Sequence, residues 1–429
     1  MQHADQVAYI ERMHGMARAN ARDDGEISHT SVEEYFDTDR FEREKAVLFR
    51  KYPVVVAFSA QLRKPGDFVA NNDSGQPILV ARGTDGKLRA FLNACRHRGA
   101  QVAQGCGHAG AFTCPYHGWT YSNDGKLRGY PFPSGYEGVD RNALGLGRVA
   151  RVGIYKGFVF GSLSAKGISL EEHLGPAMQS IDALCENSPE GEVQITAGFL
   201  QHRAKANWKF LVENETDGYH PSFVHASIFE VAKSGIGGLY SGKSTAVSRD
   251  FGNGHTENDL RPEFRLRDEP MSWFGTTANK LPDYTARMNA TYGPEKARKI
   301  MIDGTPHIMI YPNLFIAEIQ IFVIQPVAVN ETVQHVTALQ FKGAPDLNRR
   351  LRQQTMGSVG PAGFLLADDS EMYERTQMGV QMKQPEWLFL GRGKHRERRD
   401  ENGFLIGDAT DETPTRGIWR HYRGLMEAA

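Results

Sequence analysis

Two cysteine–histidine pairs stand close together in the chain. Cys95 and His97 form the first pair, Cys114 and His117 form the second, and 16 residues separate the two pairs. Two thiolates and two imidazoles make a donor set that binds metal ions. The separation leaves room for a strand or hairpin, so the pairs can sit on two separate loop tips and hold a centre from both sides. These four residues are the first candidate metal site.

A third pair, Cys106 and His108, competes with this assignment. Only five residues separate His108 from Cys114, which is too short for a strand or hairpin between two ligand loops. We therefore expect Cys106 and His108, like the isolated Cys185, to have packing or surface positions rather than ligand roles.

The donor set suits two kinds of centre. In a Rieske [2Fe–2S] cluster, two Cys bind one iron and two His bind the other. Two Cys and two His also suit a structural zinc ion, which takes four ligands in tetrahedral geometry. The spacing favours the cluster, and a protein that carries one transfers single electrons. The spacing alone does not exclude a zinc ion.

A second group of candidate ligands lies farther along the chain. His220 and His225 are five positions apart, and Pro221 between them favours a helix break that lets both imidazoles converge. Two His and one carboxylate form the facial triad of non-haem Fe(II) oxygenases, which leaves positions open for O2 and substrate. The acidic pair Asp368-Asp369 is the candidate source of the carboxylate. Each of these patterns, taken singly, is more often found without a metal.

Asp217 precedes His220 by about one helical turn. Its carboxylate is better placed to hydrogen-bond the second nitrogen of that imidazole than to bind the same iron. Carboxylates commonly orient a ligating His in this way.

Together, these motifs resemble the large (α) subunit of Rieske non-haem iron aromatic ring-hydroxylating oxygenases. The motifs are Cys-Arg-His-Arg-Gly at 95–99, Cys-Pro-Tyr-His-Gly-Trp at 114–119, the Glu-Asn to His segment at 213–225, and Gly-Pro-Ala-Gly-Phe at 360–364 ahead of the acidic pair. Two independent metal motifs in the family order argue against coincidence. They also argue against zinc, because a structural zinc site predicts no mononuclear iron site downstream.

The resemblance implies a role for each candidate residue. It assigns the [2Fe–2S] cluster to Cys95, His97, Cys114 and His117, and the mononuclear Fe(II) to His220, His225 and Asp369. Asp217 matches the aspartate that links subunits in this family, and Asn214 belongs to the same motif. Electrons would pass from the cluster of one protomer through His117 to Asp217 of the next. Such head-to-tail contacts must close into a ring, which implies an α3 or, with a small β subunit, an α3β3 oligomer.

The implied activity is that of a terminal oxygenase component. It would use O2 and electrons from a reductase, directly or through a ferredoxin, to hydroxylate an aromatic ring by cis-dihydroxylation in aromatic hydrocarbon catabolism. NAD(P)H would be consumed by the reductase, because this chain has no Gly-x-Gly-x-x-Gly dinucleotide fingerprint in a strand–turn–helix context. The alternatives are a Rieske monooxygenase, acting by ring monohydroxylation or oxidative demethylation, and a non-catalytic Rieske electron carrier. The second metal motif argues against the carrier.

The local spacing bears on the substrate. Asp217 stands three positions after Asn214 and is followed by Gly-Tyr-His. This arrangement is closer to family members that act on aromatic carboxylates, of the benzoate or anthranilate type, than to the naphthalene and biphenyl group. A carboxylate would need an Arg or Lys in the pocket, and the 50 basic residues offer many candidates.

The elements that position these sites predict an α+β fold. We expect an all-β Rieske [2Fe–2S] domain plus a larger α+β catalytic domain with a central antiparallel sheet. The expected division is a helical N-terminal segment at 1–50 packing on the catalytic domain, the Rieske domain at 51–165, and the catalytic iron domain at 166–429. Asp-Gly turns at 85–86 and 124–125 mark hairpins in the Rieske domain.

In the catalytic part, we expect helices over 170–186, from about 206, over 347–356 with Asp346 as the cap, after Gly363, and in the C-terminal tail. Alternating β-branched residues predict strands within 323–343.

The composition excludes several functions. With 50 basic and 51 acidic residues the net charge is −1, so nothing points to nucleic acid. No window approaches the roughly 18–20 apolar residues of a membrane span. The N-terminus lacks the apolar core of a secretory signal, which favours a cytoplasmic location. Four Cys are too few for a disulfide scaffold of this size.

Overall fold

The computed structural model describes residues 28–196, 198–232, 239 and 241–428, with isolated positions in the first 14 residues. The part of the expected N-terminal helical segment before residue 28 therefore lies outside the continuously described residues. Between residues 28 and 50 the chain forms a short strand as well as helical turns. These elements are β1 (His29–Ser31), a 3-10 turn (Val32–Tyr35), α2 (Thr38–Glu44) and a π-helical turn (Lys45–Phe49).

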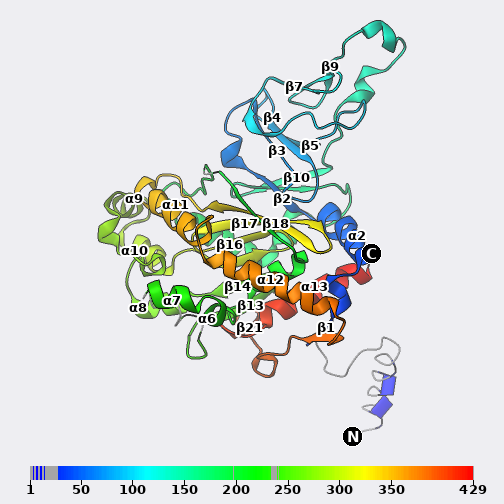
Figure 1. Cartoon of the computed structure of the whole chain (residues 1–429). Helices are drawn as coiled ribbons and strands as arrows, with labels where there is room; N and C mark the ends of the chain where they lie inside the picture. Colours follow the sequence, from blue (N-terminus) through cyan, green and yellow to red (C-terminus); the bar gives the residue numbers. More distant parts are fainter. Residues whose placement is uncertain are drawn as a thin grey trace.

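Three small antiparallel sheets follow; the first lies against the larger part of the molecule, and the other two project from it (Figure 1). The first contains β2 (Val54–Phe58), β10 (Arg151–Tyr155) and β11 (Phe158–Ser162); the second contains β3 (Asp67–Asn71), β4 (Ile78–Arg82), β5 (Leu88–Leu92) and β6 (Gly105–His108); the third contains β7 (Ala111–Thr113), β8 (Thr120–Ser122) and β9 (Leu127–Gly129). The expected hairpins are present, since β4 pairs with β5 and β8 pairs with β9; Gly86 and Gly125 in their turns have φ of +76° and +83°. Both Asp-Gly turns need this left-handed backbone, which glycine adopts without strain.

A larger sheet organises the second part of the chain. Within the described residues it has nine strands, and every pair is antiparallel, so the expected central antiparallel sheet is confirmed. The order is β12 (Leu200–Ala204), β18 (Glu331–Ala338), β17 (Gln320–Ala328), β16 (Leu314–Ala317), β15 (Ile308–Ile310), β14 (His255–Asp259), β13 (Val247–Gly252), β21 (Leu405–Asp408) and β20 (Arg398–Arg399). A separate strand, β19 (Trp387–Phe389), pairs with β1.

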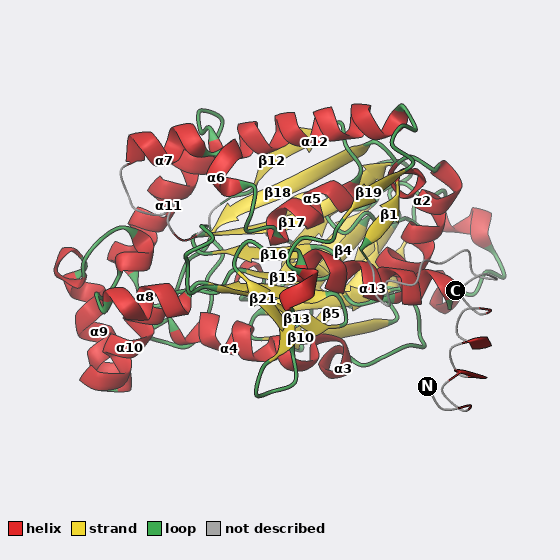
Figure 2. Ribbon diagram, turned by 90° about the horizontal axis from the view of Figure 1, so that it is seen from below, coloured by secondary structure: helices red, strands yellow, loops and turns green. Residues whose placement is uncertain are grey.

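Helices surround this sheet, and α5 and α13 lie across it in Figure 2. The helices are α3 (Leu170–Leu174), α4 (Met178–Glu186), α5 (Trp208–Thr216), α6 (Pro221–Val224), α7 (Ala226–Ala232), α8 (Arg261–Arg267), α9 (Pro282–Tyr292), α10 (Pro294–Asp303), α11 (Pro345–Val359), α12 (Leu365–Gln381) and α13 (Thr413–Glu427). The expected helices are therefore present. Asp346 lies in the first turn of α11 rather than at its cap, which is Ala344. Among the described residues, no helix is long and apolar enough to cross a membrane.

A buried carboxylate joins the N-terminal segment to two helices of the larger part. Glu44, at the end of α2, is fully buried and accepts hydrogen bonds from Trp208 Nε1 (2.7 Å), Lys209 Nζ (2.5 Å) and the Tyr422 hydroxyl (2.6 Å). A buried charge is tolerated only when it is paired and hydrogen-bonded. These three hydrogen bonds hold the start of α5 and the end of α13 against α2. Helix α5 leads directly to the candidate iron site.

Candidate metal centres

The two cysteines of the first candidate site lie in loops with the same turn. Cys95 and Cys114 are buried, and the carbonyl of each accepts a hydrogen bond from the N–H of a glycine four residues later, Gly99 (2.8 Å) and Gly118 (3.0 Å). These glycines have φ of +77° and +71°, a backbone region that disfavours larger residues. Two equivalent loops therefore present the two pairs, as the spacing predicts.

The two histidines of these loops face each other. The ring centroids of His97 and His117 are 4.5 Å apart, and Trp119 stacks on His97 with a centroid distance of 5.1 Å. Nδ1 of His97 is buried and has no hydrogen-bond partner among the described residues. A buried polar nitrogen without a partner costs free energy unless a ligand binds it. The four residues therefore fit an inorganic cluster.

Tyr121, on β8, was not singled out by the sequence. Its hydroxyl oxygen accepts a hydrogen bond from the Arg96 N–H (3.0 Å) and lies 3.1 Å from Sγ of Cys95. The Tyr121 hydroxyl can therefore donate its hydrogen to Sγ of Cys95. Burial, followed by the neighbouring Cys95, holds the pKa of Tyr121 well above its usual range, so the hydroxyl stays a donor.

The competing pair lies apart from these loops. Cys106 and His108 are exposed on β6, and Nδ1 of His108 is 3.0 Å from a carboxylate oxygen of Asp67. Cys185 is buried within α4. These residues have the packing and surface positions expected for them.

The structure brings the second group of candidate ligands together. One ligand atom from each of His220, His225 and Asp369 lies within 4.8 Å of the others. Nε2 of His225 is 3.2 Å from Oδ1 of Asp369, and Nε2 of His220 is 3.6 Å from the same oxygen. Both imidazoles therefore point the same nitrogen at one buried carboxylate, an arrangement that fits a metal ion.

The turn that carries the two histidines differs from the expected one. Helix α5 ends at Thr216, so no helix is broken between them. His220 instead precedes α6 and His225 follows it, with Pro221 as the first residue of that single turn. Pro suits this position because the first N–H of a helix has no partner within the helix. Pro221 therefore starts a helical turn, and the turn places both imidazoles on one side.

Each of these imidazoles has an acid on its other side. Nδ1 of His220 is 3.4 Å from Oδ2 of Asp217, and Nδ1 of His225 is 3.7 Å from Oδ2 of Asp368. Carboxylates in this position orient metal-binding imidazoles and raise their basicity. The two acids therefore have different positions: Asp369 faces Nε2 of both imidazoles, and Asp368 lies on the Nδ1 side of His225.

Asn214 supports the Asp369 carboxylate and connects it to Tyr373. Nδ2 of Asn214 donates to Oδ1 of Asp369 (3.3 Å) and to the hydroxyl oxygen of Tyr373 (3.1 Å). Burial, then the charges of Asp369 and Glu215, raise the pKa of Tyr373. Sequence reasoning missed Tyr373, although it follows Asp369 by one helical turn on α12 and so must lie on the same face.

Comparisons with known proteins agree with this arrangement. Residues 52–141 match the Rieske [2Fe-2S] domain family, and residues 192–427 match the family described as ring hydroxylating alpha subunit (catalytic domain). The second match spans more than half of the chain.

This chain belongs to the ring-hydroxylating oxygenase α subunits. It is therefore an enzyme with a Rieske [2Fe–2S] cluster and a mononuclear iron that uses O2. The Rieske match decides between the cluster and the zinc ion that spacing alone left open.

Individual relatives of this α subunit include aromatic dioxygenases. The chain is 29% identical to the 2-halobenzoate 1,2-dioxygenase large subunit of Burkholderia cepacia, over 84% of this chain and 78% of the relative. It is 30% identical to the anthranilate 1,2-dioxygenase large subunit of Acinetobacter baylyi, over 84% of this chain and 79% of the relative. A naphthalene 1,2-dioxygenase structure with bound indole superposes with a TM-score of 0.80 at 25% identity, over 93% of this chain and 92% of that one. A quaternary ammonium Rieske monooxygenase, at 18% identity and a TM-score of 0.66, shares the fold.

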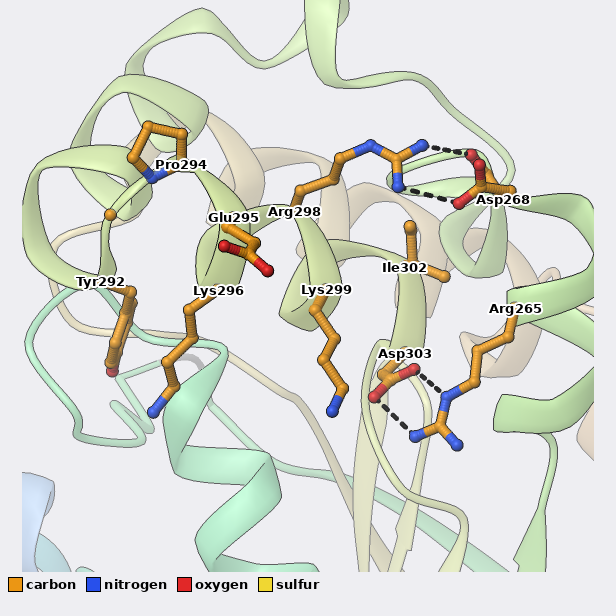
Figure 3. Close-up of a pocket in the computed structure, with 11 residues that line it drawn as sticks. Arg265, Asp268, Tyr292, Pro294, Glu295, Lys296, Arg298, Lys299, Ile302 and Asp303 are labelled. Carbon is orange, nitrogen blue, oxygen red and sulfur yellow. Dashed lines mark hydrogen bonds and ion pairs between the residues drawn. The ribbon is translucent and has the colours of Figure 1, made fainter.

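A prominent surface hollow of the α subunit is separate from both centres. It has a volume of about 800 Å³, lies at α8 and α10, and contains none of the candidate ligands (Figure 3). Its guanidinium groups are already paired, Arg265 with Asp303 (2.6 Å) and Arg298 with Asp268 (2.8 Å). This hollow is therefore distinct from the histidine–aspartate centre.

Proposed function

We propose that this chain is a terminal oxygenase subunit that adds both atoms of O2 to an aromatic ring to give a cis-diol. The observation that carries the proposal is the convergence of Nε2 of His220, Nε2 of His225 and Oδ1 of Asp369 in the part of the chain that matches the catalytic family. Two His and one carboxylate leave metal positions open for O2 and substrate.

The proposed ligands follow from the two centres. Cys95, His97, Cys114 and His117 hold the cluster, and His220, His225 and Asp369 hold the iron. When bound, the cluster supplies electrons one at a time and the iron supplies the site at which O2 is reduced. The residues of the chain do the positioning. Asn214 orients Asp369, and Asp217 and Asp368 orient the two imidazoles through Nδ1.

We further propose that electrons cross between protomers. Figure 1 shows the β7–β9 end of the Rieske part projecting away from α6, next to which the iron ligands lie. Asp217 keeps 26% of its side-chain surface accessible, so a neighbouring His117 could reach it. The resemblance implies a ring of three protomers, α3 or α3β3 with a small β subunit, and a head-to-tail contact is compatible with such a closed ring. The electron donor is a reductase, acting directly or through a ferredoxin.

The proposed substrate is an aromatic carboxylate. The spacing from Asn214 to Asp217 favours this branch of the family, and the relatives that act on 2-halobenzoate and anthranilate are 29% and 30% identical. The naphthalene enzymes, at 28% and 29%, are nearly as similar, so the substrate must be decided by experiment.

The division into residues 1–50, 51–165 and 166–429 and a cytoplasmic location remain predictions of this proposal. The contacts of Glu44 with Lys209 and Tyr422 support the packing of the N-terminal segment on the catalytic part. Limited proteolysis that releases a stable fragment ending near residue 165 would test the division.

Labelled O2 tests the reaction. The purified holoenzyme, with an NAD(P)H-dependent reductase, is given benzoate, anthranilate or naphthalene under ¹⁸O2, and the products are analysed by mass spectrometry. A cis-diol with two labels supports the proposal. A single label in a phenol would instead establish ring monohydroxylation, and hence the monooxygenase alternative.

Iron content tests the second centre independently. About three Fe per chain are expected, two in the cluster and one in the mononuclear site, whereas an electron carrier would hold about two. His225→Ala should reduce the content to about two and abolish turnover. The matched control is His395→Ala, a substitution in the turn that precedes β20, which should change neither.

A further inference from the structure

The C-terminal end of α5 is held by side chains from the central sheet. Backbone carbonyls in the last turn of a helix have no partner within the helix. Here the carbonyl of Glu215 accepts from Nε2 of His307 (3.0 Å), and the carbonyl of Thr216 accepts from Nδ2 of Asn258 (3.2 Å). His307 directly precedes β15 and Asn258 lies on β14. The sheet therefore caps the helix.

The second nitrogen of His307 faces another acceptor. Nδ1 is 3.0 Å from Oε1 of Glu318, a carboxylate. A neutral imidazole has one N–H and can donate to only one of two acceptors. The carbonyl of Glu215 and the carboxylate of Glu318 are both satisfied only when His307 is an imidazolium. A cation is also the group that the negative end of a helix favours.

The surroundings of His307 agree with this protonation state. Burial lowers the pKa of His307, but the charge and hydrogen bond of Glu318 outweigh it, and Glu257 on β14 adds to them, so that the net pKa is raised. In turn, His307 holds the pKa of Glu318 below its usual range despite burial. Glu215 on α5 is another acid of this region: burial, then the charge of Asp369, raise its pKa strongly, and its carboxylate accepts a hydrogen bond from Gln334.

Glu318 is itself fixed in place. It lies in the turn between β16 and β17, and its carbonyl accepts a hydrogen bond from the Thr305 hydroxyl (2.6 Å). The carbonyl of the next residue, Ile319, accepts from the Thr355 hydroxyl (3.1 Å). The carboxylate is thus presented by an anchored turn, and His307 connects that turn to α5.

The end of α5 determines where Asp217 stands. Asp217 is the residue at which the helix ends, and its N–H donates to the carbonyl of Asn214 (3.1 Å). From there its carboxylate accepts the N–H groups of Tyr219 (2.5 Å) and His220 (3.2 Å). A shift of the last turn of α5 would therefore move Asp217 relative to the imidazole of His220.

We propose that His307 is a positioning residue: as an imidazolium between Glu318 and the carbonyl of Glu215, it fixes the end of α5 and so holds Asp217 against His220. The proposal depends on the proposed function only for the role of Asp217 in electron transfer. The capping of α5 by His307 stands apart from that role.

The hydrogen bonds of the His307–Glu318 pair depend on pH. The folded-state pKa of His307 is raised. Its contribution to the free energy of unfolding is therefore complete below the unfolded-state pKa and is lost as the pH rises through the folded-state value. Above that value one of the two hydrogen bonds must break. Glu318→Gln removes this requirement, since an amide N–H can donate to Nδ1 of a neutral imidazole while Nε2–H still donates to Glu215.

Hydrogen exchange in the holoenzyme tests the proposal. Protection factors of the amides of residues 217–220 are measured at pH 6 and pH 9. In the wild type, protection is expected to fall at pH 9. In His307→Gln, whose amide oxygen would face the Glu318 carboxylate, protection should fall at both pH values by about tenfold, the effect of losing a hydrogen bond to a charged group. In Glu318→Gln, protection should match the wild type at pH 6 and fall less than in the wild type at pH 9.

Activity gives a second readout. His307→Gln should lower kcat more than it raises KM, because it disturbs the electron path rather than the substrate site. The matched control is His108→Gln, which breaks a histidine–carboxylate pair of the same 3.0 Å length on β6 and should leave protection at 217–220 unchanged. Wild-type protection in His307→Gln, or an undiminished pH effect in Glu318→Gln, would overturn the proposal. If the wild type hydroxylates no aromatic substrate but the exchange pattern holds, the proposed function fails and the capping by His307 stands.

Discussion

Asn214 donates a hydrogen bond from Nδ2 to Oδ1 of Asp369, over 3.3 Å and across 155 positions of sequence. The same oxygen faces Nε2 of His225 and Nε2 of His220. One amide therefore ties α5, which leads into the histidine turn, to α12, which carries the acid. This bond sets the orientation of the carboxylate before any metal binds.

Replacing Asn214 should weaken the mononuclear iron site. In Asn214→Ala, Asp369 loses a donor that fixes its oxygen, and such losses cost about 10–100-fold in metal affinity. Dialysis against a weak chelator should leave about two Fe per chain in the variant and about three in the wild type. The visible spectrum of the cluster should not change. Retention of the third iron at wild-type affinity would show that Asp369 needs no support from Asn214, and Asn402→Ala in an exposed turn is the control.

The two neighbouring acids should behave differently when each is changed to the amide. Asp369→Asn removes a carboxylate that both Nε2 atoms face, so iron retention and turnover should be abolished. Asp368→Asn changes a group 3.7 Å behind His225, so iron should be retained with about 10–100-fold lower affinity. Iron analysis and turnover of the two variants, measured side by side, check this order. The reverse order would assign the iron to Asp368.

Loss of the Tyr121 hydroxyl should lower the reduction potential of the cluster. The hydroxyl lies 3.1 Å from Sγ of Cys95, and hydrogen bonds to cluster sulfurs raise the potential because they stabilise the more negative reduced form. Tyr121→Phe keeps the ring and removes only this donor. A redox titration followed by electron paramagnetic resonance measures the shift. Tyr130→Phe, in which the replaced tyrosine also packs near Trp119, is the control, and an equal shift in both variants would contradict the assignment.

Glu213 should make the protein less stable as the pH rises. Burial raises its pKa to about 7 from 4.5, although Tyr35 and Trp419 both donate to its Oε1. A raised folded-state pKa means that the stabilising contribution is complete below about pH 4.5 and is lost as the pH rises through about 7. Glu213→Gln keeps an oxygen for both donors and does not titrate. The variant should gain about 1–3 kcal/mol relative to the wild type between pH 5 and pH 8, measured by thermal unfolding. A constant difference across this range would exclude Glu213 as the titrating group.

Much of the site could be predicted because its residues are close in sequence or belong to recognisable motifs. The loops of Cys95 and Cys114 need glycines at fixed positions to turn back, and those glycines are visible in the sequence. The sequence predicts a helix break at Pro221, whereas in the structure Pro221 begins a helical turn. Proline suits either situation, and only the end of α5 at Thr216 decides between them.

Residue types and spacing by themselves determined the two donor sets, their order in the chain and the presence of strands within 323–343, because ligand chemistry and β-propensity are local properties. Only the tertiary structure decided which acid faces the Nε2 atoms, that Tyr373 joins Asn214 beside Asp369, and that His307 and Asn258 close the end of α5. These contacts join segments far apart in the chain. They depend on how the helices pack on the sheet, and the spacing of residues along the sequence does not specify that packing.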